Sequence, residues 1–177
     1  MDRRLIPDKI NNFNAYAGTA SDANKLIGVT DEITLPNLQS MSETINLAGM
    51  AGEVDSPAVG QYQSLEIDIN FSNISKSSLE VAAQDNTPLI LRSAQEFVNP
   101  EDSTKVFMNR TITIRGMTKA INFGSLKKGG YGKPSIKKEV YYYKEVIDGE
   151  VVVEIDKFNG KAIVAGVDLT KDILEYI

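Results

Sequence analysis

The 177-residue chain contains no cysteine, no histidine and no tryptophan. The missing cysteine excludes disulfides, thiolate metal sites and cysteine nucleophiles. Without histidine the chain lacks both the commonest general base of enzymes and the commonest metal ligand of proteins. Aromatic residues make up only 7% of the sequence, which leaves little for the stacking platforms that hold sugars. We therefore expect a protein that is not an enzyme and that binds no cofactor and no metal.

Long hydrophobic runs are also missing. No stretch approaches the roughly 18 apolar residues that a membrane-spanning helix needs. The first residues include Arg3 and Arg4, but no apolar segment follows them as it would in a signal peptide. The sequence predicts a protein that is made in the cytoplasm, is not secreted by a signal peptide and does not enter a membrane.

The overall composition is that of one ordinary globular domain. Apolar residues make up 42% and charged residues 24% of the chain, both near the averages for folded proteins. A chain of this length buries about 70% of its unfolded surface in one core. We predict a single domain over residues 1–177.

Charge is strongly segregated along the chain. Residues 103–138 contain 9 basic side chains and no acidic ones, whereas the net charge of the whole chain is −5. Such blocks create surface fields that steer association. Separate acidic and basic surfaces allow copies of the chain to complement one another head to tail; the alternative is that the basic block is only a solvated loop.

Alternating apolar and polar residues predict a mainly β fold. The clearest strand is Leu65–Phe71, whose apolar side chains occupy every odd position. Further strands are expected at 30–35, 41–47, 89–98 and 110–115. The pairs Asp148-Gly149 and Asn159-Gly160 predict tight turns between C-terminal strands. The sum is an antiparallel β-sandwich or small barrel.

Helices and long loops complete the expected fold. Ser77 and Glu80 match a capping box, so we predict one packed α-helix that extends to about Gln84. A short C-terminal helix capped by Asp168 or Thr170 should close the chain. Glycine and proline punctuate a loop over residues 48–60, and a Gly- and Lys-rich loop covers residues 127–138.

Three segments resemble ligand-binding motifs, but each lacks a feature that binding of its ligand requires. Glu66, Asp68 and Asn70 have the spacing that opens a calcium loop, but the glycine and the closing glutamate of that loop are missing. Residues 124–130 nearly form a phosphate-binding loop, but a glycine stands where its lysine belongs. Phe107 lies among basic residues as in proteins that bind single strands, but the chain as a whole is acidic.

Several short motifs follow one another in an order that is typical of one family. They are Asn11–Asn14, Ile33–Leu38, Gly49–Asp55 (with Ala51 in place of a proline), the aromatic strand at 141–143, the Asp148-Gly149 turn, Glu154–Asp156 and Gly166–Asp168. In this set the chain resembles the FII-like major tail tube proteins of contractile-tailed phages and R-type bacteriocins. Residues 125–138 and the last residues depart from the pattern.

The resemblance implies a structural subunit that assembles into stacked hexameric rings, which form the inner tube within a contractile sheath. If the subunits pool their sheets into one ring-shaped barrel, every edge strand is paired. The alternation of the strands then predicts which side chains face the channel. These are Thr34, Ser42, Thr44, Asn46, Glu66, Asp68, Asn70, Thr111 and Thr113. A wall of small polar or acidic groups would be hydrated and would not grip a passing polyanion.

The two long loops are candidates for contacts between rings or between neighbouring subunits. The residues concerned are Gly49, Met50, Gly52, Glu53, Lys127, Lys128, Lys137 and Lys138. By the same resemblance, further partners are the sheath, tape-measure and baseplate proteins, with DNA as transient cargo if the particle is a phage. The protein would reside in the particle tail after assembly in the bacterial cytoplasm. Alternatives are a type VI secretion tube and a monomeric β-sandwich that binds a ligand.

Overall fold

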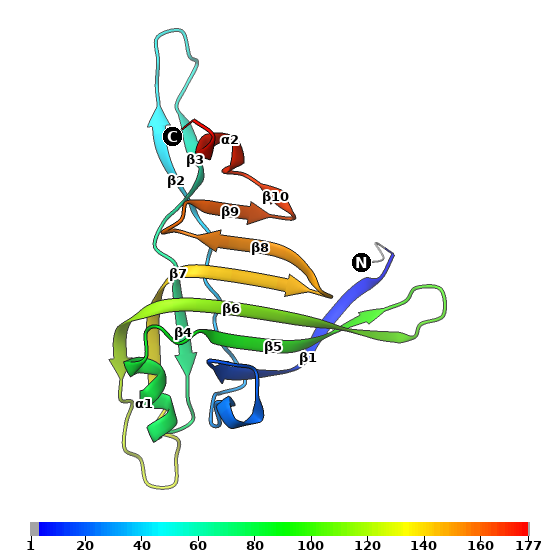
Figure 1. The fold of residues 1–177 in the computed structure, drawn as a ribbon, viewed down its shortest axis with the longest axis vertical. Coiled ribbons are helices and arrows are strands. Elements are labelled where there is room, and N and C mark those ends of the chain that lie inside the picture. Colours follow the sequence, from blue (N-terminus) through cyan, green and yellow to red (C-terminus); the bar gives the residue numbers. More distant parts are fainter. Residues whose placement is uncertain (1–3, 177) are drawn as a thin grey trace.

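The computed structural model describes residues 4–176 (Figure 1). Its strands are β1 (Ile6–Ala17), β2 (Ser40–Ile45), β3 (Val54–Tyr62), β4 (Glu66–Asn70), β5 (Leu89–Val98), β6 (Lys105–Asn122), β7 (Ser135–Ile147), β8 (Glu150–Asp156), β9 (Lys161–Val164) and β10 (Val167–Asp168). The helices are α1 (Lys76–Ala83), α2 (Lys171–Leu174) and a 3-10 turn at Asp22–Asn24. The predicted mainly β fold with one packed helix and a short C-terminal helix is confirmed.

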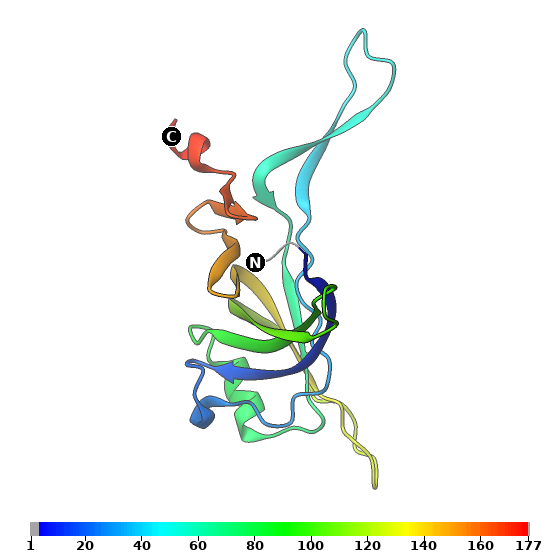
Figure 2. The same ribbon diagram turned by 90° about the vertical axis from the view of Figure 1, so that its right-hand side faces the viewer.

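Most strands belong to one antiparallel sheet. Its order is β1-β5-β6-β7-β8-β9-β10, and β4 adds to β7 to make eight strands. Strands β2 and β3 form a separate ribbon that extends beyond the rest of the chain (Figure 2). The predicted turn between β7 and β8 is confirmed, because Asp148 and Gly149 have φ angles of 49° and 81°, which a type I′ turn requires.

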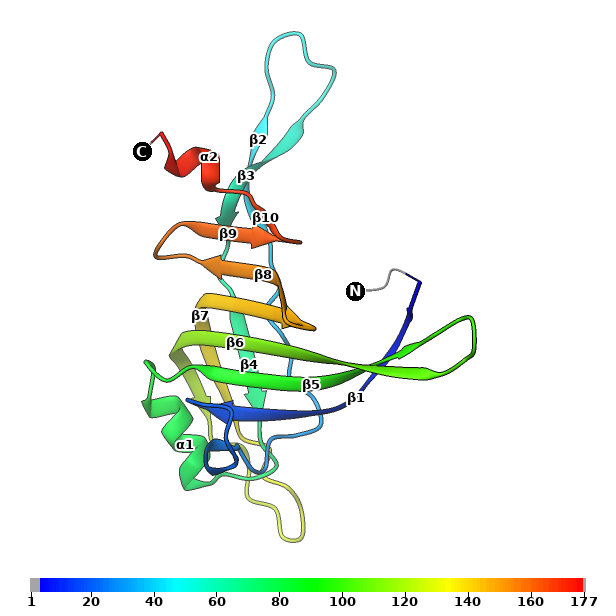
Figure 3. The ribbon, with the colours of Figure 1, turned by 45° about the vertical axis from the view of Figure 1, so that its right-hand side comes forward.

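The β6–β7 hairpin bends part-way along its length. The register between its strands shifts at Arg115/Gly116 and again at Thr118/Ala120, and irregularities of this kind bend a strand. Beyond the bend, the first residues of β7 pair with β4 from Glu66↔Glu139 to Asn70↔Ser135. As a result β4 passes behind strands β5, β6 and β7 and crosses their direction (Figure 3). The sheet therefore has an inner face, part of which β4 covers, and an outer face.

The hydrophobic core lies between β4 and the inner face of the sheet. The alternation predicted for residues 65–71 is confirmed: Ile67 and Ile69 are 0% exposed, and the polar residues between them are partly exposed. Ile112 and Ile114 of β6 meet these isoleucines in one buried cluster. Burial of side chains of this size contributes about 1.5–3 kcal/mol each, so the contact of β4 with β6 is a large part of what holds the two layers together.

Helix α1 packs on this core through Val81 and Ala82, which are buried. Its N-terminus differs from the prediction. The N-cap is Ser75, whose hydroxyl accepts a hydrogen bond from the Ser78 amide (3.1 Å), while the Ser78 hydroxyl accepts one from the Ser75 amide (2.9 Å). The capping box predicted at Ser77 and Glu80 is therefore wrong, because a serine two positions earlier makes the same reciprocal pair of bonds.

Other predictions fail at the level of segments. Residues 30–35 form no strand; they meet β4 through an isolated bridge from Thr34 to Asp68 and a hydrogen bond from the Thr30 amide to the Asn70 carbonyl (2.9 Å). The loop predicted at 48–60 is shorter, because β3 begins at Val54, and the Lys-rich loop ends at Pro134, because β7 begins at Ser135. Of the two forms expected within one copy, the closed barrel is not found: among residues 4–176 the main sheet is open and ends at β1 and β10.

The bend of the β6–β7 hairpin requires a residue without a side chain at position 116, and this requirement can be tested. A Cβ at this position would lie 2.5 Å from the Glu139 carbonyl oxygen, which is fixed by the sheet. We expect Gly116→Ala to destabilise the unassembled protein by about 1–3 kcal/mol, as overpacking does, and to lower Tm by several degrees in thermal unfolding followed by circular dichroism. Gly52→Ala is the control, since a Cβ there meets no atom within 4 Å. Equal Tm values for the two variants would contradict this account of the bend.

Candidate assembly surfaces

The outer face carries a group of polar side chains from several strands, with the partly exposed Ile90, Val146 and Ile163 between them. Pairing in register aligns Arg92 of β5 with Thr111 of β6, and aligns Thr113 of β6 with Lys144 of β7, which in turn pairs with Glu154 of β8. Because Ile112 and Ile114 point into the core, Thr111 and Thr113 point to this outer face. We call the part of the outer face carried by β5 to β9 the front face.

Hydrogen bonds and ion pairs tie the front face together. Glu154 accepts bonds from the Tyr142 hydroxyl (3.0 Å) and from Lys161 Nζ (2.8 Å), and Arg115 stacks over the Tyr142 ring at 5.1 Å from its centroid. The bond from Lys161 holds the pKa of Glu154 below its usual range. Burial, followed by the bond to Glu154, raises the pKa of Tyr142 to about 12. The face thus carries both signs of charge.

Strand β4 carries a second polar surface, on the far side of the core from the front face. Lys137 Nζ lies 3.2 Å from Glu66 Oε2 and 3.6 Å from Asp68 Oδ2. Glu66 also pairs with Lys119, and the bonds from Lys119 and then Lys137 hold the pKa of Glu66 below its ordinary value. Asn70 continues the same side of β4, and Thr34 bridges to Asp68.

The β2–β3 ribbon carries a third group of predicted residues. Ser42, Thr44 and Asn46 lie on it, and the Thr44 hydroxyl donates to Asp55 Oδ1 at 2.7 Å across the two strands. Its tip contains the predicted contact residues Gly49, Met50, Gly52 and Glu53, all of which are exposed. Apolar side chains are exposed along the ribbon as well; they are Met41, Ile45, Leu47, Met50, Val54 and Val59.

The structure consequently does not bring the predicted channel residues to one surface. Only Thr111 and Thr113 lie on the front face, while the others lie on β4, on the ribbon or on the segment before the ribbon. The sequence also missed the basic residues that accompany these threonines on the front face, namely Arg92, Arg115 and Lys144. Arg92 could have been found from the sequence, because Leu89 and Leu91 of β5 are apolar at odd positions and Arg92 therefore falls on the opposite face of the strand.

The predicted basic contact residues also divide into two groups. Lys127 and Lys128 lie in the exposed loop at 123–134, as predicted. Lys137 and Lys138 lie in β7, so their assignment to a loop is wrong. Lys138 has a side chain that is only 4% exposed and lies 3.2 Å from Asp85 Oδ1. Both lysines thus have acidic partners within their own copy.

Nothing in the described part of the chain points to a metal or to a membrane helix. Among residues 4–176, no group of three acidic side chains is placed to hold a metal ion. No helix in the same range is long and apolar enough to cross a membrane.

Comparison with known proteins adds a family and a fold. The family model described as "Phage tail tube protein FII" matches residues 7–177. Among solved structures, the chain is similar to the sheath/tube terminator, in the extended state, of the extracellular contractile injection system PVC. That likeness has a TM-score of 0.51 at 10% identity, and it covers 79% of this chain and 96% of the other. No match was found among curated proteins.

The contact between Tyr142 and Glu154 on the front face can be tested through the pH dependence of stability. Its pKa of about 12 lies above that of an unfolded tyrosine, which is about 10. Between these values the unfolded chain releases the proton first, so stability is lost as the pH rises from about 10 to 12. Tyr142→Phe should make the fall of Tm with pH shallower in that window and should remove one late-ionising phenol from the absorbance titration. Loss of a phenol that ionises at about pH 10, with the late-ionising group still present, would contradict the Tyr142–Glu154 contact.

Proposed function

Since this chain belongs to the phage tail tube protein FII family, we propose that it is the structural subunit of the inner tube of a contractile tail and assembles into stacked hexameric rings. The observation that supports this most directly is the open sheet. Beyond its pairing with β5, β1 bonds along its outer edge only near Ala15 and Tyr16, to residues 25–26, as far as residues 4–176 show. The opposite edge is the two-residue strand β10.

Exposed strand edges are hazards in a monomer, because their free N–H and C=O groups pair with other chains. In a ring, the β1 side of one copy and the β9–β10 side of the next would close each other. The same step would make one barrel from several open sheets. A contact of this kind is heterologous, and it ends in a closed ring if the rotation between copies closes.

The front face is our proposed wall of the channel, with Thr111 and Thr113 at its centre. Its strands lie side by side (Figure 1), and its polar side chains stand among the partly exposed Ile90, Val146 and Ile163. With Arg92, Arg115 and Lys144 beside Glu154, the wall would be hydrated and mixed in charge and not mainly acidic. Tight binding of a polyanion needs many uncompensated cations, and the pairing of Lys161 with Glu154 removes one of them.

The β2–β3 ribbon is our proposed contact between rings or neighbouring subunits, with Gly49, Met50, Gly52 and Glu53 at its tip. An isolated two-stranded ribbon is at best marginally stable in water. This one also exposes apolar side chains that nothing in its own copy covers, among the described residues. Packing on another copy would bury them. Sheath, tape-measure and baseplate proteins are the further partners we propose, with DNA as transient cargo in a phage and none in an R-type bacteriocin.

A terminator is the second candidate, since the similar solved structure carries that description. A terminator would bind a tube end and would not polymerise, whereas the family match favours a repeating tube subunit. A type VI secretion tube or a monomeric binding module are the remaining alternatives.

Negative-stain electron microscopy with light scattering of the purified protein separates a tube subunit from a terminator and from a monomeric binding module. We expect rings at low concentration and hollow tubes at high concentration or with a baseplate added as nucleus. Particles that bind tube ends and never lengthen would identify a terminator. A species that stays monomeric at high concentration with the nucleus present would overturn the tube subunit in favour of a binding module.

The position of the channel wall can be tested by labelling, because the chain has no cysteine of its own. In assembled tubes, we expect Thr113→Cys to react with a small maleimide but to be protected from a maleimide on a large polymer. Ser77→Cys on helix α1 is the control and should react with both reagents if that side of the tube is accessible. Equal reaction of both variants with the large reagent would exclude Thr113 from the channel wall.

A further inference from the structure

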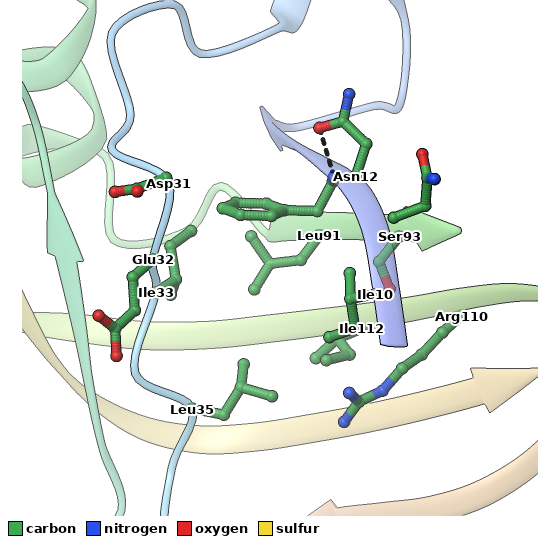
Figure 4. A pocket seen from close by; sticks show the side chains of 12 residues that line it. Ile10, Asn12, Asp31, Glu32, Ile33, Leu35, Leu91, Ser93, Arg110 and Ile112 are labelled. Atoms are coloured by element: carbon green, nitrogen blue, oxygen red, sulfur yellow. Dashed lines mark hydrogen bonds between the residues drawn. The ribbon is translucent and has the colours of Figure 1, made fainter. Parts of the chain in front are cut away.

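A cleft of about 380 Å³ opens where the inner face of the sheet is left uncovered, between β1, β5, β6 and residues 31–35 (Figure 4). Its floor is apolar and is formed by Phe13, Leu91 and Ile112 on the strands and by Ile33 and Leu35 on the facing segment. Apolar surface of this kind favours burial, and a concave apolar patch with a polar rim marks a binding surface.

The rim of this cleft is acidic. Asp31 and Glu32 are exposed and belong to its lining, and Figure 4 shows both on the segment that faces the strands. The one basic residue of the lining, Arg110, is already neutralised, because its Nε lies 2.7 Å from Glu145 Oε1. An occupant with an apolar centre and positive charges would therefore match the cleft.

The loop at residues 123–134, which we call the basic loop, has this character. Leu126 is fully exposed, at 106% of its reference area, and it is followed directly by Lys127 and Lys128. The loop contains no acidic residue. It projects from the body (Figure 2) and contributes no side chain to the cleft of its own copy.

The basic loop is also held in shape before any contact forms. The Ser125 amide donates to the Gly132 carbonyl (2.8 Å) and the Gly130 amide donates to the Lys127 carbonyl (3.1 Å). Gly124 closes its base with a φ of +71°, at a point where a Cβ would lie 2.1 Å from the Gly132 oxygen. A preformed loop loses less conformational entropy on binding than a disordered one.

We propose that the basic loop of one copy docks into the acidic-rimmed cleft of a second copy, which places Leu126 on the apolar floor and Lys127 and Lys128 beside Asp31 and Glu32. The proposal rests on the proposed function for its setting and adds the receiving surface to it. One chain supplies both halves of the contact at different places, so the contact repeats from copy to copy.

The β2–β3 ribbon also projects with exposed apolar side chains, but its charge makes it a poorer occupant of the cleft than the basic loop. The β2–β3 ribbon, residues 40–62, contains the acidic Glu43, Glu53 and Asp55 and no basic residue. In the cleft it would face Asp31 and Glu32 with charge of the same sign, and such a juxtaposition disfavours binding.

Disulfide trapping in this cysteine-free chain tests the contact directly. Leu126→Cys and Ile33→Cys proteins are prepared separately, mixed and oxidised. We expect a disulfide-linked dimer on a non-reducing gel. The matched control mixes Ile33→Cys with Leu47→Cys, which is exposed on the acidic ribbon, and should give little linked product. Equal linking in the two mixtures would overturn the proposal.

Charge reversal provides an independent test. Lys127→Glu with Lys128→Glu should raise the protein concentration needed for assembly by about tenfold or more, as should Asp31→Lys with Glu32→Lys. All four changes in one chain should restore assembly. Tubes that form without the Leu126–Ile33 link, or that are indifferent to these reversals, would overturn the docking but leave the proposed function standing. The link without any tube would support the docking and count against the proposed function.

Discussion

The packing of β4 across the inner face of the sheet is the constraint on which the rest of the structure depends. Ile67 and Ile69 are buried only because β6 and β7 bend and carry β4 behind the front strands. The bend in turn requires a close approach at Gly116 that only a glycine permits. Once β4 is in place, the inner face is a core and the outer face is left to water. β4 covers only part of the inner face, and the cleft beside Leu91 is the part that remains open.

The same folding step sorts the lysines of the basic block into two kinds. Those on strands, such as Lys119 and Lys137, meet the carboxylates of β4 and are neutralised within the copy. Lys127 and Lys128 lie in the loop between β6 and β7, where no carboxylate of residues 4–176 forms an ion pair with them. The sequence shows one block of charge, whereas the fold leaves only the tip of that block available to a partner. Screened surface charges act over about 10 Å at 0.1 M salt, so this tip matters at contact.

Local signals predicted most of the secondary structure and little of its arrangement. The alternation at Leu65–Phe71 and the Asp148-Gly149 turn depend on neighbours in sequence, and both are confirmed. The position of Thr113 relative to Asp68 depends on where the β6–β7 register shifts, and no local pattern encodes that bend. Alternation identifies which side chains share one face of a strand, but a bent sheet turns equivalent faces toward different sides of the molecule. For this reason the residues predicted to line one channel occupy separate surfaces, and Lys138, placed in a loop by composition, is buried in a strand.

A subunit that polymerises needs exposed strand edges and apolar patches as contact surfaces, whereas a monomeric domain avoids them. This chain leaves a strand edge at β1, apolar side chains on the β2–β3 ribbon, a cleft at the core and a basic loop with an exposed Leu126. Each feature alone is a liability in water, since exposed edges and apolar patches promote unspecific association. Their charges make that association selective, because the acidic ribbon and the basic loop cannot exchange places against the rim formed by Asp31 and Glu32. Selectivity of this kind favours one repeating contact over many random ones, which is the condition for an ordered tube in place of an aggregate.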